Sequence, residues 1–265
     1  MPIERLSFRE VQAYELNTRP EVLDFIDSNA AYLGGFIESS GVIYFNEIER
    51  GNWYPRFEFA NNNRSSQEQL AGLLDGSIFK VKGQKSWRLF ISKSGLVQYL
   101  GNAIAPFAPS RGEIVNAVNN WQEAESMDER AEIVQSYHQD RTRRFTDLGV
   151  KEYEPLVRMP EFVAGVFDGC ASSVVIRERY PEYLFYTDHR LLTALQDKFG
   201  GSLNITNKAG TQKTIRDIAF ISKHDVWMLH IARSEAVRGL LHFIKPHVIT
   251  KGAELERGLE LLEAA

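Results

Sequence analysis

Apolar and polar positions in the first part of the chain follow two alternating spacings. Some stretches repeat an apolar residue every three or four positions, as one face of a helix does, and others alternate residue by residue, as a half-buried strand does. The spacings predict helix, strand, strand, helix, strand, strand and helix over residues 29–38, 41–48, 54–60, 65–74, 77–82, 86–91 and 94–105. This αββαββα order predicts an α+β unit built on an antiparallel sheet.

The same order of elements returns in the second half of the chain. It predicts a helix, two strands, a helix, one strand and a helix over residues 160–169, 172–178, 182–186, 189–199, 202–206 and 234–244. Residues 215–221 and 226–231 compete for the place of the last strand. Further helices are predicted over residues 113–121, 128–144 and 254–262.

Residue identities support a duplication as well. Residues 33–38 (LGGFIE) resemble 163–168 (VAGVFD), and residues 89–94 (LFISKS) resemble 229–234 (LHIARS). Landmarks that keep their order at similar spacing are typical of an internal repeat. We therefore divide the chain into an N-terminal extension (1–27), a first repeat (28–112), a helical connection (113–158) and a second repeat with a C-terminal helix (159–265).

Composition and charge narrow the class of protein. The chain has a net charge of −4, one cysteine and no apolar run long enough to span a membrane. Its N-terminus lacks the apolar core of a signal peptide, so we expect the cytoplasm or an organelle matrix. Basic residues are concentrated in residues 41–112 and 172–252, and the flanking segments are acidic. Such partitioning lets one surface attract phosphates although the whole chain is acidic.

The helices that open the two repeats resemble a motif of a known family. Residues 33–41 (LGGFIESSG) and 163–171 (VAGVFDGCA), each opening an αββαββα unit, resemble the LAGLIDADG motif of the LAGLIDADG homing endonucleases. The resemblance implies two repeats related by a pseudo-twofold axis, whose antiparallel sheets form a saddle-shaped nucleic-acid-binding surface. It also implies that the two motif helices cross closely at small residues, here Gly34, Gly35, Ala164 and Gly165.

The active-site positions depart from the family pattern. The sixth motif position is acidic in the family and stays so here, as Glu38 and Asp168. The eighth position, which in the family carries the metal-binding carboxylate, is Ser40 in one motif and Cys170 in the other. A hydroxyl and a thiol are poor ligands for Mg²⁺. We therefore expect no intact catalytic site and no cofactor, with Mg²⁺ relevant only if Glu38 and Asp168 act as ligands in an active enzyme.

The resemblance implies that one face of each sheet lies along duplex DNA. Strand alternation with Phe57, Phe59, Phe79, Val81, Trp87 and Leu89 in the core predicts which cations face outward. The expected nucleic-acid-binding residues are Arg56, Lys80, Lys82, Lys85, Arg88, Arg177, Arg179, Lys208, Lys213, Arg216, and the matching pair Arg111 and Lys251 that follows the last helix of each repeat. Glu58 and Asp217 would weaken this face.

Three functions remain open from the sequence. The first is a monomeric, cleavage-inactive protein that binds double-stranded DNA or structured intron RNA, the latter as a group I intron maturase. The second is an active, metal-dependent homing endonuclease that makes double-strand cuts. The third is an interaction scaffold that keeps only the fold. The sequence does not specify a target site, the host or a role for residues 1–27.

Overall fold

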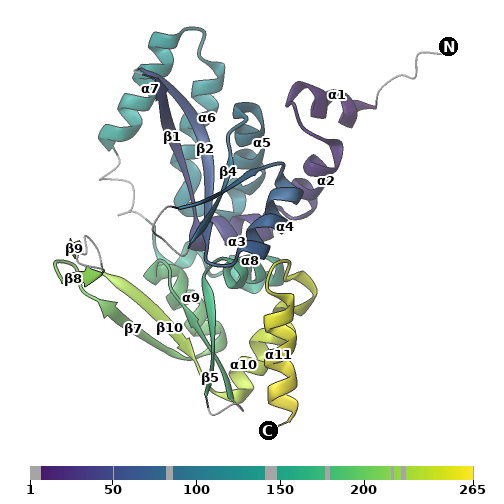
Figure 1. The fold of residues 1–265 in the computed structure, drawn as a ribbon, viewed down its shortest axis with the longest axis vertical. Helices are drawn as coiled ribbons and strands as arrows, with labels where there is room; N and C mark the ends of the chain where they lie inside the picture. The colour runs from purple at the N-terminus through teal and green to yellow at the C-terminus, as the bar shows by residue number, and fades with distance from the viewer. Residues whose placement is uncertain are drawn as a thin grey trace. The chain divides into compact units, whose positions relative to one another are not determined.

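The computed structural model describes residues 7–49, 51–81, 86–140, 148–176, 180–215, 218–221 and 225–264. The chain divides into two compact units, Met1–Leu148 and Gly149–Ala265 (Figure 1). The boundary between the units falls inside the segment 113–158 that the sequence assigned to a connection. Each unit has its own sheet and its own apolar core.

The first unit contains the first predicted repeat. Its elements are α1 (Phe8–Glu15), α2 (Pro20–Ser28), α3 (Ala30–Ser40), β1 (Gly41–Glu49), β2 (Asn52–Asn61), α4 (Arg64–Leu74), β3 (Ser77–Lys80), β4 (Trp87–Ile91), α5 (Ser94–Ile104), α6 (Gly112–Glu123) and α7 (Met127–Asp140). Two short 3-10 turns, Ala105–Phe107 and Pro109–Arg111, join α5 to α6. The order from α3 to α5 confirms the predicted αββαββα unit.

The first sheet has the strand order β1-β2-β4-β3 and is antiparallel throughout. Its core face carries Phe57 and Phe59, which are fully buried and pair across the sheet with Ile91 and Leu89. Helices α3, α4 and α5 pack on the strands. At the far end of the β1–β2 hairpin, Phe45 of β1 contacts rings of α6 and α7, so these helices extend the same cover.

The register of β3 corrects one part of the predicted pattern. Ile78 pairs with buried Leu89 on the core face, whereas Phe79 is 56% exposed on the opposite, outer face. The prediction that Phe79 lies in the core and Lys80 faces outward is therefore wrong. Lys80 lies on the same face of the sheet as Trp87, and its Nζ is 5.7 Å from the centre of the Trp87 ring. The edge strand has apolar residues at successive positions, and the shorter Ile takes the core site.

The second unit contains the second repeat. Its elements are α8 (Pro160–Cys170), β5 (Ala171–Ile176), β6 (Tyr180–Phe185), α9 (His189–Phe199), β7 (Ser202–Asn207), β8 (Gln212–Ile215), β9 (Ile218–Ile221), β10 (Val226–Ile231), α10 (Ser234–Ile244) and α11 (Gly252–Glu263). Two 3-10 turns, Val150–Glu152 and Leu156–Arg158, precede α8 and pack on α9 and α8.

The second sheet has the order β5-β6-β10-β7, which matches the first sheet strand for strand. The last strand is Val226–Ile231, and β8 and β9 form a separate hairpin inserted between β7 and β10. This insertion explains why two segments competed for the last strand in the sequence. The predicted fold class, two αββαββα units with antiparallel sheets, is confirmed. In the part of the chain that the structure describes, no helix is both long and apolar enough to cross a bilayer.

Candidate nucleic-acid interface

The two motif helices end in the same way. Helices α3 and α8 each run for 11 residues and finish at the eighth motif position, Ser40 in α3 and Cys170 in α8. The next residue of each begins a strand, so the eighth position lies where the helix meets the first strand of the sheet. The Ser40 hydroxyl donates to the carbonyl of Phe36 at 3.3 Å, and Cys170 is a half-buried thiol.

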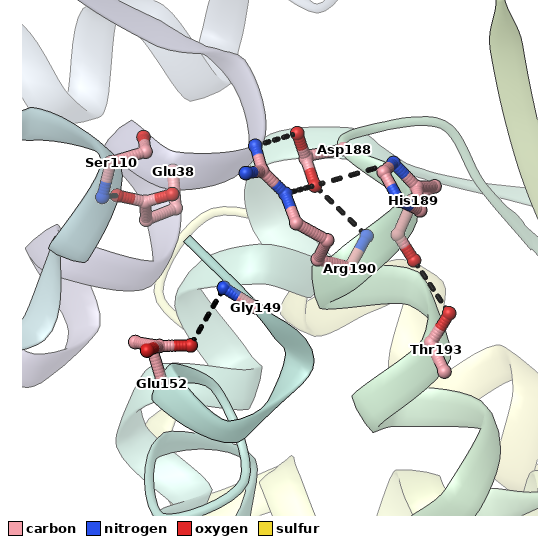
Figure 2. Close-up of polar contacts among 8 residues, drawn as sticks. All are labelled: Glu38, Ser110, Gly149, Glu152, Asp188, His189, Arg190 and Thr193. Atoms are coloured by element: carbon pink, nitrogen blue, oxygen red, sulfur yellow. Dashed lines mark hydrogen bonds and ion pairs between the residues drawn. The ribbon is translucent and has the colours of Figure 1, made fainter. Parts of the chain in front are cut away.

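The acids at the sixth motif position bind main-chain N–H groups. Asp168 is fully buried, and its carboxylate accepts from the N–H groups of Ile249 and Thr250 at 2.8 Å and Lys251 at 3.0 Å. In the first unit Glu38 is 5% exposed and accepts from the N–H of Ser110 at 2.9 Å; the two residues face one another in Figure 2. Each acid therefore fixes the loop that follows the last helix of its own repeat.

The basic residue of the same loop binds the C-terminal end of the motif helix. Arg111 donates through Nη2 to the carbonyls of Ile37 at 3.3 Å and Gly41 at 3.0 Å. The matching Lys251 donates through Nζ to the carbonyls of Phe167, at 3.0 Å, and Ala171. A cation at the last carbonyls of a helix satisfies orphan acceptors and offsets the negative end of its dipole.

Burial changes the titration of one of these cations. Burial lowers the pKa of Lys251 below its ordinary value, and it outweighs the opposing effect of nearby Glu254, Cys170 and Asp168. Arg111 and Lys251 were predicted to bind nucleic acid, whereas the structure has both side chains donating to main-chain carbonyls. The matching positions of this pair in the two repeats are visible in the sequence, whereas the role of the loop N–H groups is not, because no side-chain pattern reveals it.

Two predicted cations do lie on the outer face of the first sheet. Arg88 of β4 forms an ion pair with Glu58 of β2, with Nη1 and Oε1 2.7 Å apart. Tyr44 of β1 donates to the other oxygen of Glu58 at 3.1 Å. Burial, followed by the charge of Glu58, raises the pKa of Tyr44. Arg56 lies with its guanidinium 5.0 Å from the centre of the Phe90 ring. Arg56 and Arg88 therefore both lie on the face where they were expected. Glu58, the acid expected to weaken this face, is paired with Arg88.

The remaining predicted cations are less well placed. Lys208 is exposed in the turn that follows β7, and Lys80 lies on the opposite face of the first sheet, as described above. For Lys213, which is in β8, only the main chain is described. Five others lie outside the described residues: Lys82, Lys85, Arg177, Arg179 and Arg216. Asp217, the second expected acid, lies outside them too.

The outer face of the second sheet has different chemistry. His230 of β10 and Glu182 of β6 lie side by side, with Nε2 and Oε2 2.5 Å apart. Asn204 and Ser202 of β7 lie on the same face, because they pair with Met228 and His230 of β10. Neither His230 nor Glu182 was among the residues predicted to bind nucleic acid. Alternation about buried Leu229 and Ile231 would have placed His230 on this face.

Solved structures of known proteins share this architecture over most of the chain. The chain is similar to the homing endonuclease I-GzeII in complex with its DNA target, with a TM-score of 0.57, 15% identity, and 89% of each chain covered. It is also similar to I-SmaMI bound to cleaved DNA, with a TM-score of 0.57, 14% identity, and 89% of this chain and 88% of that one covered. The fold is that of the LAGLIDADG homing endonucleases.

A third solved structure agrees with this assignment. The meganuclease I-AabMI bound to uncleaved DNA matches with a TM-score of 0.54 and 13% identity, over 89% of this chain and 91% of that one. No protein-family model matches the sequence, and no curated protein matches it significantly. The likeness is therefore one of fold, carried by the order of elements and by the motif helices, with little sequence identity.

A divalent metal, which the LAGLIDADG fold implies, does not fit the residues at the motif helices. Hard cations are bound by carboxylate and carbonyl oxygens, and Ser40 and Cys170 provide no carboxylate. Glu38 and Asp168 are buried against loop N–H groups. Among the residues that the structure describes, no three His, Cys, Asp or Glu side chains come together as a metal site.

The small residues of the motif helices are buried, and one of them has a clear steric reason. A Cβ on Gly34 would lie 2.4 Å from the Cβ of Phe107 and 2.8 Å from its carbonyl oxygen. Gly34 is thus required for the close approach of the turn after α5. Gly35, Ala164 and Gly165 are buried as well. Crossing of the two motif helices at these residues stays a prediction.

Proposed function

We propose that this chain is a monomeric double-stranded DNA-binding protein with the LAGLIDADG homing-endonuclease fold, and that it does not cleave its ligand. Support for duplex DNA comes from the structural neighbours, which include endonucleases bound to DNA targets. It also comes from Arg56 and Arg88 on the outer face of the first sheet. An arginine on a sheet face can read guanine edges or hold phosphates.

The absence of cleavage rests mainly on one observation, the hydrogen bonding of the sixth-position acids. Asp168 uses both carboxylate oxygens to accept three main-chain N–H groups. A metal at this carboxylate would have to compete with the N–H groups of residues 249–251. The eighth positions, Ser40 and Cys170, offer neutral side chains instead of carboxylates. The eighth positions therefore supply no charge to a hydrolytic metal, and the sixth-position carboxylates are engaged by main-chain N–H groups.

The proposal is tested by measuring binding and cleavage separately. A mobility shift with random-sequence duplex at low salt should appear at about micromolar protein, because non-specific phosphate contacts suffice there, and it should weaken as salt rises. A supercoiled plasmid incubated with Mg²⁺ or Mn²⁺ should stay uncut. A plasmid carrying the protein's own host locus without its inserted coding sequence extends the cleavage test to the site that a homing endonuclease would recognise.

A gain-of-function variant makes the test sharper. The double variant Ser40→Asp with Cys170→Asp places carboxylates at both eighth positions, and nicking should be recovered if the rest of the site is intact. Ser39→Asp combined with Gly169→Asp is the matched control, because it adds the same two carboxylates to α3 and α8 one residue earlier. Wild-type cleavage that disappears in Asp168→Asn would overturn the inactive assignment, and an absent mobility shift would overturn DNA binding itself.

The RNA alternative is separated by competition. If the physiological ligand is structured intron RNA, as in a group I intron maturase, folded intron RNA should displace duplex DNA at a concentration well below that of unstructured RNA. Equal competition by both RNAs would leave duplex DNA as the ligand. The monomer is tested by sedimentation of the free protein and of the complex.

A further inference from the structure

The outer face of the first sheet carries aromatic side chains where a solvated face would carry polar ones. Phe79 is 56% exposed on the edge strand β3, and Phe90 of the neighbouring strand lies on the same face, because its partner across the ladder is Ser77. The core face has its own apolar residues, Ile78, Leu89 and Ile91. Phe79 and Phe90 therefore do not serve the core of the unit.

The two rings frame a hollow that has a cation at its edge. Their centres are 5.5 Å apart, and their planes are tilted by 56°. The guanidinium of Arg56 lies 5.0 Å from the centre of the Phe90 ring. Arg56, Ser77, Phe79, Phe90 and Ser92 line a hollow of about 330 Å³. The exposed ring of Phe79 forms one wall of this hollow, and the hydroxyls of Ser77 and Ser92 and the guanidinium of Arg56 are among its other lining groups.

This arrangement is specific to the first sheet. Strand pairing matches Phe90 with His230, because each lies opposite the first residue of its edge strand, Ser77 or Ser202. By the same register Phe79 corresponds to Asn204, and Arg56 corresponds to Glu182. The second sheet therefore has an amide, an imidazole and a carboxylate where the first has two aromatic rings and a guanidinium. The shared fold does not require the aromatic hollow.

The chemistry of the hollow points to one class of ligand. An aromatic platform with an arginine is how proteins hold bases that are not paired, because every base has a flat π-face and the cation attracts the backbone. In a paired duplex the bases are already stacked on one another, and only their edges are accessible from a groove. A stacking platform is therefore useful only for a base outside a duplex.

We propose that this hollow, lined by Arg56, Ser77, Phe79, Phe90 and Ser92, binds an unpaired nucleobase of a bound nucleic-acid strand. The base stacks on the exposed ring of Phe79 and meets Phe90 at an angle, and Arg56, which lies over the Phe90 ring, holds the polar edge of the base or the adjoining phosphate. The inference rests on the proposed nucleic-acid binding and deepens it, since it assigns preference for single-stranded or bulged positions to the first sheet. It involves no covalent step.

The test compares three fluorescent ligands in anisotropy titrations of the full-length protein. They are a single DNA strand of about 12 nucleotides, an abasic strand of the same length and charge, and a perfect duplex. The base-containing strand should bind about 5- to 150-fold more tightly than the abasic strand, the range expected for one stacked base. A 2-aminopurine in the strand should be quenched on binding.

Three variants assign that preference to the hollow. Phe79→Ala should remove the advantage of the base-containing strand, and Phe79→Leu, which keeps the apolar bulk without the ring, should remove most of it. Arg56→Lys keeps the charge but loses the planar guanidinium, so it should reduce quenching more than affinity. The matched control is Phe8→Ala, which deletes an 84% exposed ring on α1, away from the sheet, and should change nothing.

The outcomes separate this inference from duplex binding. If the wild type binds the duplex but binds base-containing and abasic strands equally, the hollow is not a base site and the proposed function stands. If Phe79→Ala weakens binding of the perfect duplex as much as that of the strand, Phe79 contacts paired bases and the inference is overturned. If the protein binds none of the three ligands, both the inference and the proposed function fail.

Discussion

Removing the Asp168 carboxylate is the most informative perturbation of the motif helices. Asp168→Ala leaves three N–H groups, those of residues 249–251, without their acceptor. At about 1.5 kcal/mol for each bond to a charged acceptor, the sum is about 4–5 kcal/mol. The loop residues are half-buried, so water can reach part of the vacated site. We therefore expect a loss of about 3–4 kcal/mol in the free energy of unfolding.

Chemical denaturation of the second unit measures this loss. Of the four tryptophans, only Trp227 follows residue 148, so its environment can be monitored once the other three are replaced by Phe in the same background. Hydrogen exchange at residues 249–251 should rise in the variant. Cys170→Ala, at the neighbouring eighth position, should cost less than about 1 kcal/mol because the thiol is only half-buried. If both variants lose the same small amount, Asp168 does not anchor the loop, and a metal-binding role for it becomes tenable again.

Three further predictions concern packing and pH. Gly34→Ala should destabilise the first unit by about 1–3 kcal/mol in urea titration, because the new methyl group overlaps Phe107. Gly72→Ala in α4 should stabilise it by about 0.5–1 kcal/mol, because a Cβ there meets nothing within 4 Å; equal effects of the two changes would refute the steric argument. Burial tends to raise the pKa of Asp188, but hydrogen bonds from Arg190 outweigh it and lower that pKa (Figure 2). The resulting stabilisation is present above the ordinary Asp pKa of about 3.9. It is lost as pH falls through the lower pKa of Asp188 in the folded protein. The difference in the free energy of unfolding between wild type and Asp188→Asn should therefore disappear on acidification.

Much of the fold could be predicted because the same order of helical and strand periodicities occurs twice in the chain, once in each repeat. The helices at His189–Phe199 and Ser234–Ile244 have the predicted ends, and the αββαββα order is confirmed in both units. Prediction was weakest where a strand is short and at an edge. In β3 both Ile78 and Phe79 are apolar, so alternation could not decide which of them enters the core.

The candidate site was predictable only in its side-chain chemistry. The acids of the sixth position, the neutral eighth position and the arginines of the first sheet are visible as letters in the sequence. The partners of those acids are main-chain N–H groups of a loop, which every residue except proline carries, so no pattern identifies them. The aromatic hollow was not predicted because alternation placed Phe79 in the core. Its partner Phe90 lies on the outer face, where only cations were expected.

The contacts of the sixth-position acids also bear on the order in which each repeat assembles. Glu38 and Ser110 are 72 positions apart in the chain, and Asp168 and Ile249 are 81 apart. Contacts between positions so distant require closure of a large loop, so they form after the hairpins that lie between them. Each acid thus connects the first helix of its repeat to the segment that follows the last helix of the same repeat. A repeat whose chain is cut within a hairpin should consequently stay assembled, which makes the loops between the strands of each sheet suitable positions for dividing this protein into two complementing fragments.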